Sequence, residues 1–149
     1  MTLKELFAGR DVDIPAIQKR LKKVADSLSL PLANRTMTYN SRLAQELAKW
    51  AESEGKGAEF HHAVFRAYFV DGKNIAMADE LARLAESVGL PAQEARQAVL
   101  SRRLRQAVDA DWERSRALGI DAVPTFIFSS RRIVGFQPYE ALAELVNRP

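Results

Sequence analysis

Apolar residues recur at helical spacing through most of the chain before residue 118. Steps of three and four residues place side chains on one face of an α-helix. The first run with this spacing predicts a helix over about residues 14–29. Its apolar face consists of Ile14, Ile17, Leu21, Val24 and Leu28.

The same period predicts further helices over about residues 39–54, 58–70, 75–88 and 90–108, the last of them continuing to Leu118. The helix over 58–70 is apolar on more than one face, so we expect it to be the most deeply buried. Its aromatic residues should form core rather than a cofactor site. They are Phe60, Phe65, Tyr68 and Phe69.

The pattern changes after Gly119. Residues 123–128 and 132–136 are rich in β-branched and aromatic side chains, which is typical of strands. They predict a β-hairpin, although the connection at Ser129-Ser130 lacks the Asn-Gly signal. Pro138 then begins a final helix. The chain is thus expected to be one mainly helical α+β domain, with a helical subdomain over about 1–118 and a second part over about 119–149.

Composition narrows the classes of function. The formal charge is +3, and there is no cysteine, which excludes a disulfide, a cysteine-ligated zinc and a cysteine nucleophile within this chain. No apolar run reaches the roughly 20 residues of a membrane span, and the first residues lack the apolar segment of a secretory signal. We therefore expect a cytoplasmic protein without a membrane partner.

Basic residues gather around Arg102–Arg105 and at Arg131-Arg132. No aromatic residues lie between them to stack on bases, so a solvated helix face is favoured over a nucleic-acid site. The other polar clusters are equally poor candidates for catalysis. His61 and His62 point about 100° apart on a helix and cannot readily share a metal ion. Asp109 and Glu113 lie beside Arg105 and Arg114 in the sequence, so we expect them to be ion-paired charges on the surface. We predict no catalytic residue and no metal ligand.

The segment Gly119-Ile120-Asp121-Ala122-Val123-Pro124-Thr125-Phe126 resembles the G-(V/I)-x-(G/A)-V-P-T-F segment of DsbA-like thioredoxin-fold oxidoreductases. Gly135-Phe136-Gln137-Pro138 is similar to that family's step into its last helix. Residues 39–44 and 59–69 resemble its helical subdomain. The nearest branch is that of the FrnE-type proteins, the 2-hydroxychromene-2-carboxylate isomerases and the kappa-class glutathione transferases.

The resemblance implies a thioredoxin fold that lacks its first β-α-β unit, because the family's opening strand, Cys-x-x-Cys helix and second strand have no counterpart in this chain. It also implies that Val123, Pro124 and Thr125 form the family's cis-proline loop. Proline has no N–H, so sheet pairing stops there and the backbone of Val123 is left to pair with an extended peptide or glutathione.

The family activity is protein thiol–disulfide exchange, which requires a thiolate. We therefore expect this cysteine-free chain to be redox-inactive. One alternative is a glutathione-dependent isomerase or transferase, which borrows the thiol of its cofactor. Another is a non-enzymatic helical interaction module. Since a lone hairpin exposes an apolar face, we also expect the chain to form homo-oligomers.

Overall fold

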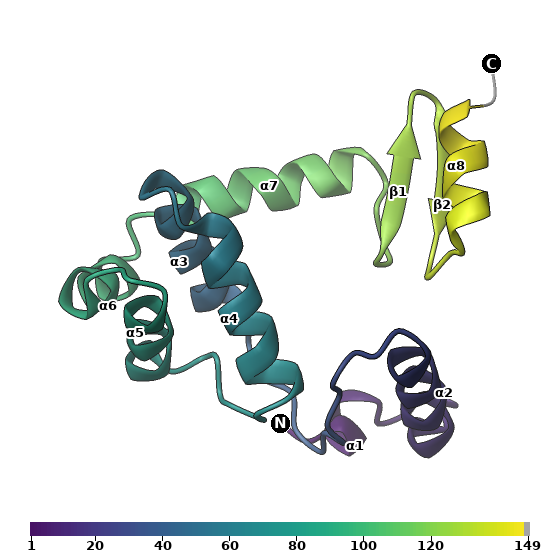
Figure 1. Ribbon diagram of the computed structural model, residues 1–149, viewed down its shortest axis with the longest axis horizontal. Helices are drawn as coiled ribbons and strands as arrows, with labels where there is room; N and C mark the ends of the chain where they lie inside the picture. The colour runs from purple at the N-terminus through teal and green to yellow at the C-terminus, as the bar shows by residue number, and fades with distance from the viewer. Residues whose placement is uncertain (148–149) are drawn as a thin grey trace. The chain divides into compact units, whose positions relative to one another are not determined.

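The computed structural model describes residues 1–147 of the 149 (Figure 1). It divides into two compact units, Met1–Val108 and Asp109–Pro149, and the boundary falls within helix α7. In chain order, the elements are α1 (Leu3–Leu6), α2 (Ile14–Ser27), α3 (Arg42–Ser53), α4 (Gly57–Phe69), α5 (Ala78–Ser87), α6 (Ala92–Ser101), α7 (Arg105–Ala117), β1 (Thr125–Phe128), β2 (Arg131–Val134) and α8 (Tyr139–Asn147).

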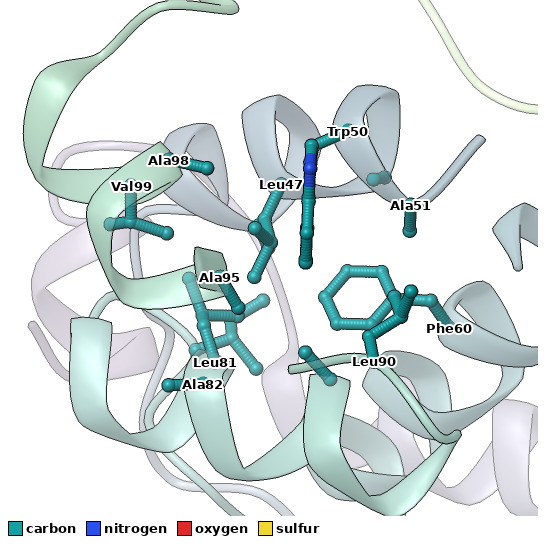
Figure 2. Close-up of a cluster of buried hydrophobic side chains, with 14 residues drawn as sticks. Leu47, Trp50, Ala51, Phe60, Leu81, Ala82, Leu90, Ala95, Ala98 and Val99 are labelled. Carbon is teal, nitrogen blue, oxygen red and sulfur yellow. The ribbon is translucent and has the colours of Figure 1, made fainter. Parts of the chain in front are cut away.

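The core of the first unit lies where α3, α4, α5 and α6 pack on one another. Figure 2 shows Trp50 and Phe60 pointing into the same interior as Leu81. Trp50 is 2% exposed, and Phe60 and Leu81 are completely buried. Small residues complete the interior and let the helices approach closely: Ala44, Ala48, Ala51, Ala82, Ala85, Ala95 and Ala98.

The most buried helix is α3, and the expectation that the helix over 58–70 would be so is wrong. Six residues of α3 are buried, whereas in α4 only Phe60 and Ala67 are. Apolar residues of α4 lie on more than one side of the helix, and the other helices of the first unit do not cover all of them. Phe65 is 54% exposed for this reason.

The predicted continuous helix over 90–118 is also wrong, because α6 and α7 are separate. Arg102 ends α6 in the left-handed conformation with a φ of 53°. Its Nε and Nη2 atoms donate to the carboxylate of Glu46 at 2.7 and 2.8 Å. Glu46 is 1% exposed and also accepts from Arg42 Nε at 2.7 Å. This contact between helices distant in sequence fixes the break.

The N-terminal segment joins the unit through backbone contacts. Thr2 caps α1 in a reciprocal pair with Glu5, and Thr2 also bridges to Met37. The N–H of Ala33 donates to the carbonyl of Phe69 at 3.0 Å. Helix α2 occupies most of its predicted range, and Asp13 caps it by accepting from the N–H of Ala16.

The second unit contains the predicted hairpin and final helix. Strands β1 and β2 pair antiparallel, from Thr125 opposite Val134 to Phe128 opposite Arg131. Ser129 adopts a φ of 56°, which supplies the tight turn without an Asn-Gly pair. Helix α8 packs on both strands. No helix of the described residues is long and apolar enough to cross a membrane.

Candidate functional site

The residues predicted to bind a ligand form a loop directly before β1. Thr125 is the first residue of that strand, and Val123 and Pro124 precede it. The peptide bond between Val123 and Pro124 is cis. Val123 is 87% exposed, which is unusual for an apolar β-branched residue next to a strand.

Side-chain and backbone hydrogen bonds hold the loop on both sides of Val123. The hydroxyl of Thr125 donates to the carbonyl of Ala122 at 2.6 Å. The N–H of Gly135 donates to the carbonyl of Pro124 at 2.8 Å, which ties the loop to the end of β2. Gly135 has a φ of +87°, a conformation that favours glycine. The residues on either side of Val123 therefore hold the loop in place, and Val123 itself does not.

A further contact fixes the approach to the loop. Arg132 Nη1 donates to the carbonyl of Gly119 at 2.9 Å, so β2 holds the turn that follows α7. The sequence places Arg132 in a basic surface cluster and, through the resemblance, places Gly135 only in the step into the last helix. Arg132 and Gly135 reach the loop because of the register in which the two strands pair. The sequence alone does not reveal this register.

The geometry leaves the backbone of Val123 able to form hydrogen bonds with a ligand. None of the described residues forms a hydrogen bond with the backbone of Val123, and Pro124 has no N–H. The N–H and carbonyl of Val123 are therefore available to an extended chain, which could add as a short strand. No cysteine exists in the sequence to react with such a chain.

The histidines and the aromatic residues of α4 belong to the first unit, whereas the loop belongs to the second. His61 packs on Phe65, with ring centroids 5.6 Å apart. Among residues 1–147, no three potential metal-ligating side chains lie together. The aromatic residues of α4 are core in part: Phe60 is fully buried and Tyr68 packs on the core, whereas Phe65 is 54% exposed. All four aromatic residues line a cavity of about 420 Å³ against α3.

The family model of the DSBA-like thioredoxin domain matches residues 3–147 of the chain. In sequence, the chain is 33% identical over 124 residues to the uncharacterized protein YwbO of Bacillus subtilis (strain 168). That match covers 80% of this chain and 60% of YwbO. The chain is 26% identical over 121 residues to the ClpXP adapter protein SpxH of Halalkalibacterium halodurans, covering 75% of this chain and 39% of SpxH. It thus spans less than two thirds of either relative.

The structure is similar to that of a probable DsbA oxidoreductase from Streptomyces coelicolor, with a TM-score of 0.84 and 23% sequence identity. The match covers 95% of this chain and 64% of the other. At this identity the similarity concerns the fold. The chain therefore has the order of elements of a DsbA-like fold, with a helical subdomain followed by the hairpin and the last helix.

Proposed function

The chain belongs to the DSBA-like thioredoxin domain family, and from this we propose that it binds an extended polypeptide at the Val123–Pro124–Thr125 loop while supplying no reactive thiol itself. The proposal is carried by the exposure of Val123 and by the availability of its backbone groups. Its side chain is 87% exposed and its backbone groups form no hydrogen bond with the described residues. Both sides of the loop are nevertheless fixed, so a bound strand would not have to order it.

The chemistry of thiol exchange supports a binding role. Disulfides exchange by attack of a thiolate on sulfur, through a mixed disulfide. A chain of 149 residues without cysteine offers neither the nucleophile nor the sulfur that is attacked. Any thiol at this loop must belong to a bound partner, and the chain by itself is inactive in disulfide exchange.

The relatives are compatible with a role performed through binding. SpxH is named as an adapter protein of ClpXP, and an adapter acts by holding another protein. Glutathione is the small ligand for the same loop, because it is a short extended peptide that carries a thiol. In the glutathione-dependent alternative, that thiol would replace the absent cysteine.

Two substitutions at Val123 test the proposal. Val123→Ala removes only an exposed side chain and keeps the backbone N–H, so binding should persist. Val123→Pro removes the N–H and should weaken binding about fivefold or more, the effect of one lost hydrogen bond. The probe is the isotope-labelled chain titrated with an unstructured cysteine-containing peptide, followed by amide shifts over residues 119–125 and 134–136.

A serine version of the peptide and glutathione form the other arms of this titration. Backbone pairing predicts that the serine peptide binds as well as the cysteine peptide. Equal binding by Val123→Ala and Val123→Pro, with both variants folded by circular dichroism, would contradict the proposal. Saturable shifts with glutathione and none with either peptide would favour the glutathione-dependent reading instead.

We also propose that the hairpin mediates self-association. Three of its apolar side chains, and Phe136 just after β2, are between 41% and 65% exposed; the three are Ile127, Phe128 and Val134. Among residues 1–147, the sheet contains β1 and β2 alone, so each strand has one edge without a partner strand. Exposed edges with apolar side chains favour pairing with another chain.

A further inference from the structure

Arg35 is a cation without an anionic partner in the described part of the chain. Its guanidinium lies over the rings of Tyr68 and Phe69, with its carbon 4.4 and 4.8 Å from the two centroids. The Nη1 atom is buried and has no hydrogen-bond partner among residues 1–147. Unsatisfied buried donors are rare in native structures, and none of the described residues neutralises the charge of Arg35.

The same arginine lines an apolar cavity of about 310 Å³ between α1, α2 and the segment that follows them. Most of the lining is aliphatic or aromatic, contributed by Leu3, Leu6, Phe7, Ile14, Ile17 and Leu21. Ile17 and Leu21 are 45% and 52% exposed, so each side chain still has apolar surface to bury. The volume lies at the small end of the range for ligand pockets.

The charges around the cavity favour an anion. No acidic side chain lines it. Two carboxylates of the same segment are already engaged, since Asp13 accepts from the N–H of Ala16 and Glu5 from the N–H of Thr2. Arg35 is the charged group in the cavity lining, and its polar neighbours there are Gln18, Asn34 and Thr38.

We propose that this cavity binds a small amphiphilic carboxylate, with the acid group on Arg35 and an apolar tail along α1 and α2. A planar guanidinium pairs with a carboxylate through two parallel hydrogen bonds. The contacts with Tyr68 and Phe69 restrict the position of the guanidinium before the ligand arrives. The aliphatic lining then selects for a tail rather than for a second polar group.

Isothermal titration of the full chain with octanoate, with octanol as its neutral match, tests both halves of the site. Octanoate should bind at least tenfold more tightly than octanol, because the alcohol cannot form the charged pair with Arg35. Hexanoate, shorter by two methylenes, should bind about tenfold more weakly than octanoate. Equal binding of octanoate, octanol and octylammonium would overturn the proposal without any variant.

Variants locate the ligand. Arg35→Met should weaken octanoate about tenfold and leave octanol unchanged, while Arg83→Met, at an exposed arginine of α5, should change neither. Ile17→Asn should weaken both ligands. If Phe65→Ala abolishes binding and Ile17→Asn does not, the ligand occupies the cavity beside α3 and α4, and the proposal fails. Circular dichroism verifies that each variant is folded.

Discussion

Glu46 of α3 is almost completely buried, and two arginines balance the charge of its carboxylate. Arg102 and Arg42 donate three hydrogen bonds of 2.7 to 2.8 Å to its oxygens. The bonds from Arg102, with a smaller contribution from Arg42, hold the pKa of Glu46 below its ordinary value of 4.5, although burial opposes them. The ionised state is therefore part of the folded structure.

Glu46→Gln should lower the free energy of unfolding by about 2 kcal/mol at pH 7. The amide keeps the size of the side chain but leaves two guanidinium groups without their counter-charge. The loss is smaller than for a fully buried pair because Arg102 is 42% exposed. Urea denaturation measures it, with Glu52→Gln as the control, since Glu52 is 50% exposed beside Lys49 and should change stability by less than about 0.5 kcal/mol.

The same residue sets a pH dependence. A carboxyl whose pKa is lower in the folded state stabilises the fold above its unfolded pKa of 4.5, and this stabilisation disappears as pH falls through the folded pKa. Denaturation midpoints should thus stay level from pH 7 to about 5 and decline below about 4.5. In Glu46→Gln the decline should be shallower. An identical slope in both proteins would mean that other carboxyls carry the acid sensitivity.

At the scale of single residues, the sequence indicated which segment is of interest better than it indicated which distant residues contact that segment. The residues alone predicted a strand over 123–128, whereas β1 begins at Thr125, and only the resemblance to the family's V-P-T-F segment indicated a loop at Val123-Pro124. Gly135 and Arg132, which anchor the loop, gave no such signal. Their roles depend on which strand residue lies opposite which, and no property of either side chain encodes this.

Among the elements, α5 contributes the fully buried Leu81 to the helical core. Leu81→Ala should lower the free energy of unfolding by about 3 kcal/mol, because Leu81 is fully buried and its removal leaves a cavity between helices. Figure 2 shows it among residues of the neighbouring helices. The matched control is Leu100→Ala on α6, where the side chain is 64% exposed and the change should stay within about 0.5 kcal/mol. Equal losses from the two variants would contradict this account of the core.

The period of apolar residues predicted most of these elements but not where they are interrupted. It located α2, α3, α4 and α5 to within a few residues, since each has a clear apolar face. It missed the break at Arg102, because arginine is a good helix former and only its pairing with Glu46 on α3 fixes the left-handed turn. It missed α1, whose four residues are too few for a period to show.

For the whole molecule, the order of elements decided the family more firmly than any single motif. A Val-Pro-Thr-Phe segment recurs by chance, but here it follows a helical subdomain and precedes a hairpin and a last helix. The structure has that order, and the family match extends over residues 3–147. Burial was harder to predict, because the exposed side of α4 depends on which elements the folded chain brings against it.

Self-association is the property of the whole molecule that the exposed hairpin predicts. The chain should form dimers or larger species at micromolar concentrations, since two-stranded sheets need further strands or a covering surface for stability. Val134→Lys should shift the molecule toward monomer, because a lysine on an exposed strand opposes edge pairing. Leu100→Lys on α6 adds the same charge at a more exposed position and should leave the assembly unchanged. Light scattering coupled to size-exclusion chromatography measures the mass of each. A monomeric parent chain across this range, or equal dissociation by both lysines, would show that the hairpin is not the interface.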